Sequence, residues 1–160
     1  MTTYVYGWKE GTDPTNHFDN YSQVIEFENE KVHLSLWDTT DDREERLNEY
    51  LSTTIFVIAF SIISRPSYNH VSSRWVRELH RHSPNTPFLL VGTKIDRRGD
   101  NTMRKVEGVA PIETSQGVEL AKQMKAISYL EISSKLNIGV REVVEEAMRW
   151  AVQGVKMRRG

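Results

Sequence analysis

Residues 87–96 read PFLLVGTKID, and this stretch decides the class of fold. Its apolar run, Phe88–Val91, is too short for a helix and is bounded by a proline and a glycine. Such a run is typical of a strand that is buried on both faces of a parallel sheet. The polar segment Thr93–Asp96 then follows the carboxyl end of that strand, which is the edge where open α/β sheets bind ligands. This loop is therefore the first candidate for a binding site.

The composition indicates one soluble globular domain over residues 1–160 and excludes several classes of function. The chain carries 21 basic and 22 acidic residues, so its formal net charge of −1 gives no global attraction to nucleic acid. It has no cysteine, which excludes disulfides, thiolate metal sites and thiol catalysis. No run of about 18 apolar residues occurs, so we expect no membrane span and a cytoplasmic protein.

Four other stretches have the patterns of strands. Thr54–Ser61 is a second continuous apolar run and reads as a central strand, and Tyr129–Ile132 is a shorter one. Tyr21–Phe27 and Lys31–Trp37 alternate apolar and polar residues on either side of a polar turn, which predicts an antiparallel hairpin. Thr3–Tyr6 is a short strand-like run near the N-terminus.

Helical patterns separate the predicted strands. Ser64–His80 begins with a capping serine and an early proline, and Thr114–Met124 has Thr114 as its expected N-cap. A third helix is expected over Gly139–Val155. The residues expected to face inward from the second helix are Val118, Leu120, Ala121 and Met124. Strands that alternate with helices predict an α/β fold with a mostly parallel sheet flanked by helices.

Several residues are interpreted as structural rather than functional. Trp37 and Trp75 are expected to be packing residues, and Arg97 and Arg98 are expected to be ordinary exposed charges. The acidic stretch Asp38–Glu45 is expected to be an exposed loop or the start of a helix.

Five stretches of the sequence form a recognisable series: PTNHFDNYS at 14–22, LSLWDTT at 34–40, PNTP at 84–87, TKID at 93–96 and YLEISSK at 129–135. Taken in this order, they resemble the Rho family of Ras-like small GTPases, and the register can be followed from Pro14 to about Ala151. The resemblance implies a single small-GTPase-like domain with a P-loop NTPase-like fold, which binds GTP or GDP with Mg²⁺. It also implies that residues 97–110 are a shortened form of the Rho insert region, and that residues 1–13 are an atypical N-terminus.

The resemblance assigns roles to individual residues. Asp96 would accept two hydrogen bonds from guanine, Lys94 would lie over the base, and the backbone at Ser134 and Lys135 would reach the guanine oxygen. The nucleotide-binding set is Thr93, Lys94, Asp96, Ser133, Ser134 and Lys135; the metal-binding pair is Thr15 and Asp38; the partner-binding residues are Phe18, Asp19, Asn20 and Tyr21. Hard oxygen ligands such as those of the pair suit Mg²⁺.

Plainer interpretations of the same residues stay open from the sequence alone. The segment TKID could be an ordinary polar loop, and Asp38 could cap the turn that follows a strand. Residues 18–21 could be a plain edge strand.

The phosphate-binding loop departs from the family pattern. A working loop reads G-x-x-x-x-G-K-[ST], so that its amides and its lysine surround the phosphates. The nearest candidate, Gly7–Thr12, is one residue too short and has no lysine after its second glycine. Only two residues separate Gly11 from Pro14, so the helix that normally follows the loop is also missing. The first strand, loop and first helix are therefore expected to be reduced or absent.

The second switch region and the C-terminus also depart from the family. Asp41 takes the place of the glycine that meets the γ-phosphate, and Asp42 takes the place of the catalytic glutamine. No residue is therefore assigned a catalytic role. The chain ends VKMRRG with no cysteine, so we expect no lipid anchor on it.

The first hypothesis is a degenerate or N-terminally truncated Rho-type GTPase. It would act as a pseudo-GTPase or as a module that binds protein effectors or regulators of the Rho type, with no nucleic acid partner. The alternative is a functional GTPase that hydrolyses slowly and uses Gly7–Thr12 as a non-standard phosphate loop. A third possibility is a partial copy of a complete family member.

Overall fold

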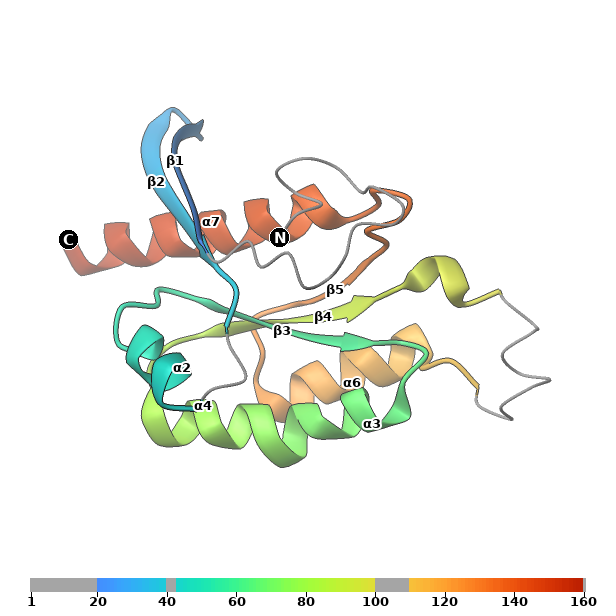
Figure 1. The fold of residues 1–160 in the computed structure, drawn as a ribbon. Coiled ribbons are helices and arrows are strands. Elements are labelled where there is room, and N and C mark those ends of the chain that lie inside the picture. Colours follow the sequence, from blue (N-terminus) through green and yellow to red (C-terminus); the bar gives the residue numbers. More distant parts are fainter. Residues whose placement is uncertain (1–19, 40–42, 100–109, 160) are drawn as a thin grey trace.

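A computed structural model describes residues 20–39, 43–99 and 110–159 (Figure 1). The sequence-based predictions for residues 1–19, 40–42 and 100–109 lie outside these ranges. They include the strand at 3–6, the phosphate-loop candidate at 7–12 and most of the insert region.

A parallel sheet of three strands forms the centre of the described chain. Its strands, in spatial order, are β3 (Phe56–Ser61), β4 (Phe88–Thr93) and β5 (Tyr129–Ile132). Phe56 lies opposite Phe88, and Leu90 lies opposite Tyr129, so both pairs of strands run in the same direction. All of β4 except its last residue is buried, as the run FLLV predicts. The predicted parallel α/β sheet is therefore confirmed.

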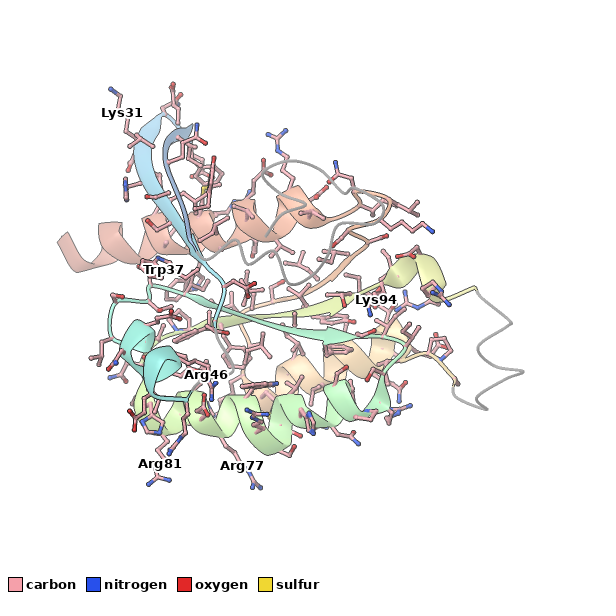
Figure 2. All side chains as sticks on the ribbon, in the orientation of Figure 1. Lys31, Trp37, Arg46, Arg77, Arg81 and Lys94 are labelled. Atoms are coloured by element: carbon pink, nitrogen blue, oxygen red, sulfur yellow. The ribbon has the colours of Figure 1, made fainter. Side chains whose placement is uncertain are left out.

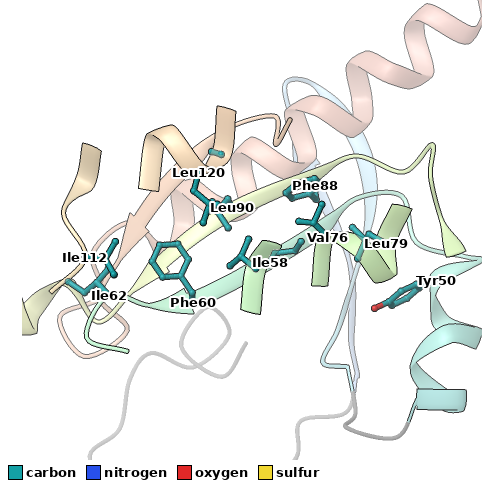
Figure 3. Packing of buried hydrophobic residues seen from close by; sticks show 12 residues of the cluster. Tyr50, Ile58, Phe60, Ile62, Val76, Leu79, Phe88, Leu90, Ile112 and Leu120 are labelled. Carbon is teal, nitrogen blue, oxygen red and sulfur yellow. The ribbon is translucent and has the colours of Figure 1, made fainter. Parts of the chain in front are cut away.

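Helices cover both faces of this sheet (Figure 1). One face packs against α3 (Arg65–His70), η1 (Val71–Trp75), α4 (Val76–His82) and α6 (Thr114–Met124); the other packs against α7 (Val140–Arg159). On the first face, Phe60 and Leu90 belong to the larger core cluster (Figure 3). On the second face, Leu89 and Val91 pack with Val143. The described part of the chain has no helix that is long and apolar enough to cross a membrane.

The predicted hairpin forms a separate two-stranded sheet. It consists of β1 (Asn20–Phe27) and β2 (Glu30–Trp37), with Val24 opposite His33. Within the described ranges, neither strand pairs with β3. On β3 the side chains alternate, so Val57 and Ala59 point away from the face that holds Ile58 and Phe60. Val57 is 48% exposed, which shows that the described elements leave this end of the sheet partly uncovered.

The longest predicted helix is continuous but irregular. Ser64 caps it as expected, since its hydroxyl accepts a hydrogen bond from the Ser67 amide at 3.3 Å, and Pro66 lies in the first turn. Residues Val71–Trp75 then form a π-helical turn before α4 extends the helix to His82. A short helix, α2 (Arg43–Tyr50), precedes β3 and packs near α4.

Three predictions about single residues of the helices and strands are wrong. Glu113, not Thr114, is the N-cap of α6, because it forms a capping box with Gln116, whose side chain accepts from the Glu113 amide at 3.0 Å. Val118 is 52% exposed, because Gly117, Leu120 and Ala121 occupy the face of α6 that meets the sheet.

Trp37 is the third wrong prediction, since it is 55% exposed instead of packed. The alternation of β2 places it on the outer face with His33 and Ser35, whereas Leu34 and Leu36 point to the half-buried face. Trp75, by contrast, packs against the core as expected.

Candidate functional site

The loops that follow β4 and β5 lie side by side at one edge of the sheet. Thr93 is opposite Ile132 in the parallel register, so both strands deliver their next residues to the same place. The Ser133 hydroxyl donates a hydrogen bond to Asp96 Oδ1 at 2.6 Å. The structure thus brings together the two stretches that the sequence analysis assigned to base recognition, which are 37 residues apart in the chain.

The loop after β4 is shaped by its backbone. Lys94 has a left-handed conformation, with φ 66° and ψ 36°, and the short 3₁₀ turn η2 (Ile95–Arg97) begins directly after it. The Thr93 hydroxyl donates to the Phe60 carbonyl at 3.1 Å, so it ties the loop to β3 instead of pointing to an open site. The Lys94 side chain is exposed beside η2 (Figure 2). Asp96 is half-buried where the turn faces the next loop.

The loop after β5 is closed by main-chain hydrogen bonds. Ser133 and Ile138 exchange two of them, each 3.0 Å long, and the Leu136 amide donates to the Ser133 hydroxyl at 3.1 Å. Ser133 is fully buried, Ser134 is half-buried and Lys135 is exposed. This loop therefore holds Ser133 in one orientation.

These contacts determine what Asp96 can do. A serine hydroxyl has one proton, and the Ser133 proton is used on Oδ1 of Asp96. Among the residues that the structure describes, none donates to the second carboxylate oxygen. The second oxygen of Asp96 is thus available as an acceptor at this edge of the sheet. The guanine-reading role of Asp96 stays a prediction.

A partly buried ion pair connects the segments that carry the two loops. Arg98 donates from its two terminal nitrogens to the two carboxylate oxygens of Glu131, at 2.7 and 2.6 Å. Tyr129 and Thr114 donate to the same carboxylate, at 2.8 and 3.1 Å. Arg98 follows the base loop, Glu131 lies two residues before Ser133, and Thr114 begins α6. The network therefore joins the three segments that surround the candidate site.

The electrostatics of this network favour the ionised carboxylate. Burial opposes ionisation of Glu131 and is the largest single influence, but the hydrogen bonds from Arg98 and Tyr129 outweigh it, so the pKa of Glu131 is lowered. The hydrogen bond to Glu131 raises the pKa of Arg98. Burial, together with its hydrogen bond to Glu131, raises the pKa of Tyr129.

The position of the Tyr129 ring explains why residues 92 and 117 are glycines. A Cβ atom at Gly92 would lie 2.4 Å from the Tyr129 hydroxyl, and one at Gly117 would lie 2.1 Å from the ring. The ring needs this space to bring its hydroxyl to Glu131. The two glycines therefore belong to the support of the site.

Sequence reasoning missed the Arg98–Glu131 pair, and the interpretation of Arg98 as an exposed charge is wrong. A signal was present in YLEIS, where one glutamate interrupts an apolar strand. A carboxylate at such a position needs a cationic partner when the strand is buried. The partner itself could not be identified from spacing, because it lies 33 residues earlier in the chain.

A second polar cluster holds α2 against α4. Arg46, whose side chain is only 3% exposed, donates to both carboxylate oxygens of Glu78 at 2.8 and 3.1 Å. Tyr50 donates to the same carboxylate at 2.8 Å, and the Arg46 guanidinium lies 5.5 Å from the centre of the Trp75 ring. The hydrogen bond from Arg46 lowers the pKa of Glu78, and burial is the main cause that raises the pKa of Tyr50 to about 12. The helix that follows residues 40–42 is thus fixed by a buried pair, which the sequence analysis did not predict.

The remaining assigned residues are only partly described. Thr15, Phe18, Asp19, Asp41 and Asp42 lie outside the described ranges. Asp38 is exposed just after β2. Asn20 opens β1 opposite Trp37, and the hydroxyl of half-buried Tyr21 donates to Gln23. The described residues contain no group of three or more histidine or acidic side chains that could hold a metal ion. The metal and partner assignments therefore stay predictions.

The chain was compared with models of known protein families. The model described as the Ras family matches residues 2–153, which is nearly the whole sequence. Members of that family bind GTP or GDP with Mg²⁺ and bind effector and regulator proteins. The match does not distinguish subfamilies.

Proposed function

This chain belongs to the Ras family of small GTPases, and from that premise we propose that it is a Rho-type signalling protein with half of a nucleotide site. It keeps the loops that read guanine and has lost the loop that binds phosphate. The observation that carries the proposal is the Ser133–Asp96 hydrogen bond of 2.6 Å, supported by the Arg98–Glu131 network.

Selection of the base and tight binding of the nucleotide are separate properties. Asp96 would accept hydrogen bonds from guanine, the Lys94 stem would lie over the base, and the backbone at Ser134 and Lys135 would meet the guanine oxygen. Each charged hydrogen bond lost from the phosphates removes about 1.5–3 kcal/mol. The sequence contains no G-x-x-x-x-G-K-[ST] motif. We therefore expect guanine selectivity with weak affinity.

Hydrolysis is expected to be weak or absent. Asp41 and Asp42 add two negative charges where the family has a glycine and a water-orienting glutamine. Bound Mg²⁺ would neutralise charge on the phosphates, and Asp38 and Thr15 are the residues proposed to hold it. Two carboxylates beside a polyphosphate would repel the negative charge of the phosphates, and this repulsion opposes the neutralisation that Mg²⁺ provides.

The signalling role would be carried by protein contacts. The proposed partner surface is the edge at Phe18, Asp19, Asn20 and Tyr21, and the partners would be effectors or regulators of the Rho type. We propose a cytoplasmic protein with one domain over residues 1–160, an atypical segment at 1–13 and a shortened insert at 97–110.

A second candidate function rests on the same base loops. Their intact hydrogen bonding is also what a working GTPase would need, with Gly7–Thr12 as its phosphate loop. This candidate predicts tight binding that depends on Mg²⁺, followed by slow hydrolysis. The first candidate predicts neither.

Titration of the purified protein with fluorescent GDP and GTP, with and without Mg²⁺, separates the two. Weak, guanine-selective binding that is lost in Asp96→Ala supports the first candidate, a protein that keeps the guanine loops and lacks the phosphate loop. Submicromolar binding that requires Mg²⁺ supports the working GTPase. Glu142→Ala, which removes an exposed carboxylate on α7, is the matched control and leaves binding unchanged. A folded protein with no guanine selectivity at any concentration overturns both.

A further inference from the structure

A groove runs between the π-helical turn with α4 and the C-terminal end of α6. Its volume is about 630 Å³. Half-buried Met124 supplies apolar surface, and Arg77, His80 and Lys125 supply polar and cationic side chains. None of these residues belongs to the candidate guanine site.

The helices on either side of the groove carry an excess of positive charge. Arg74, Arg77 and Arg81 are exposed along η1 and α4, and Lys122 and Lys125 are exposed on and after α6. Figure 2 shows Arg77 and Arg81 pointing away from the body of the molecule. In the described part of the chain, Arg77, Arg81, Lys122 and Lys125 have no carboxylate partner.

The acidic residues on these helices do not compensate for that charge. Only Glu78 and Glu119 occur on η1, α4 and α6. Glu78 is bound to Arg46 and Tyr50, and Glu119 is a single exposed carboxylate against the five cations named above. The basic surface is therefore available to a ligand from outside.

The glutamates of the hairpin and of α7 differ from these cations, because several of them have cationic partners. Glu145 pairs with Arg141, and Arg149 contacts both Glu146 and Glu28. The cations beside the groove have no such partners among the described residues. Unpaired cations on one face attract an anionic partner even when the whole chain is almost neutral.

We propose that this groove binds an acidic peptide segment of a partner protein, one in which acidic and apolar residues alternate. Charge complementarity identifies the acidic part, and the half-buried Met124 side chain, which forms the apolar floor of the groove, identifies the apolar part. The cations line a concave site, where an extended chain reaches the floor and the rim together. A flat anionic membrane would reach only the rim.

The proposal does not depend on nucleotide binding. The groove is formed by α4 and α6 and contains no residue of the loops after β4 and β5. The peptide therefore binds equally with and without guanine nucleotide. Failure of the nucleotide titration leaves this proposal intact, and its own failure leaves the guanine site intact.

The test is fluorescence anisotropy with a labelled peptide of about a dozen residues in which glutamate and leucine alternate. The protein binds this peptide at low salt, and raising the ionic strength from about 0.05 to 0.3 M weakens binding about tenfold. Arg77→Glu weakens binding about tenfold, and adding Lys125→Glu weakens it further. Lys31→Glu, an equal charge reversal on the exposed hairpin, changes affinity less than twofold. Circular dichroism confirms that each variant is folded.

Four outcomes contradict the proposal. One is no binding of the peptide by the folded wild-type protein. Another is that Lys31→Glu and Arg77→Glu weaken peptide binding equally, which would show that the peptide is attracted by the charge of the whole protein and not by the groove. The third is binding to phosphatidylserine vesicles, lost in Arg77→Glu, by a protein that ignores the peptide; this would identify a membrane-docking face. A polyglutamate chain that binds as tightly as the mixed peptide contradicts the role of the apolar floor.

Discussion

The two edges of the central sheet, one formed by β5 and the other by β3, differ in how completely the described chain covers them. On the side of β5, β4 is buried on both faces, and the loops after β4 and β5 are joined by the Ser133–Asp96 hydrogen bond and the Arg98–Glu131 pair. On the side of the hairpin, β3 exposes Val57, and β1 and β2 form a sheet of their own. Neither of these two contacts involves a residue before β4, so we expect the proposed loss of phosphate binding to leave both of them intact.

The largest expected difference between the two sides comes from a matched pair of truncations. Leu89 and Val57 are opposite each other in the parallel register and share a face of the sheet, but Leu89 is fully buried. Leu89→Ala should lower the free energy of unfolding by about 2–5 kcal/mol, as for a buried leucine. Val57→Ala should lower it by less than about 1 kcal/mol, because half of its surface is already in water. Urea denaturation measures both.

The result for Val57 also tests the first predicted strand. An equal loss for the two variants would contradict the comparison and show that Val57 is covered in solution. The run at 3–6 would then be the candidate cover.

The next largest effect is expected in the support of the base loops. Arg98→Ala leaves the Glu131 carboxylate partly buried without its cation, which should cost about 1.5–3 kcal/mol. The same variant should weaken guanine binding, because Arg98 anchors the loop that contains Asp96. Arg141→Ala removes an exposed partner of Glu145 and is the control, with an expected loss below about 0.5 kcal/mol. Denaturation and nucleotide titration of both variants are the measurements, and equal losses would show that the Arg98 pair behaves as a surface contact.

Acid sensitivity should follow from the same pair. The folded-state pKa of Glu131 lies below its ordinary value of 4.5, so its stabilising contribution is complete above that pH and is lost as the pH falls through the folded-state value. Glu131→Gln should therefore flatten the fall in unfolding free energy below about pH 4.5. Glu142→Gln, which changes an exposed carboxylate, should leave the curve unchanged. Parallel acid curves for wild type and Glu131→Gln would contradict the assigned ion pair.

The sequence predicted the strands and helices better than the contacts that join them. The runs FLLV and TIFVIAFS are dense enough in apolar residues to identify buried strands, and Ser64 with Pro66 identified a helix start. Thr114 was chosen as a cap because residue type favours it, but the reciprocal bonds of Glu113 and Gln116 decide the position. The Arg98–Glu131 and Arg46–Glu78 pairs join residues more than 30 positions apart, so no local pattern contains them.

Of the candidate site, the sequence predicted the two loops and the residues that meet there. It did not predict that the Thr93 hydroxyl is used on the Phe60 carbonyl, because that bond depends on the register of β3 against β4. Side-chain direction at the sheet edge is a property of the assembled strands. Residue type alone suggests a role but does not assign it.

A smaller effect is expected from the cluster that holds α2. Tyr50→Phe removes one hydrogen bond to Glu78 and keeps the ring contact with Phe56, so it should cost about 0.5–1.5 kcal/mol. Nucleotide selectivity should not change, because α2 contributes nothing to the loops after β4 and β5. Tyr21→Phe is the control on the hairpin, where exposed Gln23 is the one partner of the hydroxyl among the described residues. A change in guanine selectivity in Tyr50→Phe would show that α2 is coupled to the loops after β4 and β5, which would contradict their expected independence.

The smallest effect should come from Thr114, the exposed member of the Arg98–Glu131 network. Thr114→Val removes the 3.1 Å hydrogen bond to Glu131 without changing the shape of the side chain, while Arg98 and Tyr129 still satisfy the carboxylate. Because the bond is exposed, its loss should cost less than about 1 kcal/mol. Thr54→Val, an exposed threonine before β3, is the matched control and should cost nothing measurable. If denaturation instead shows that Thr114→Val costs as much as Arg98→Ala, then the hydroxyl and the guanidinium hold Glu131 as one unit, and the support of the base loops extends into α6.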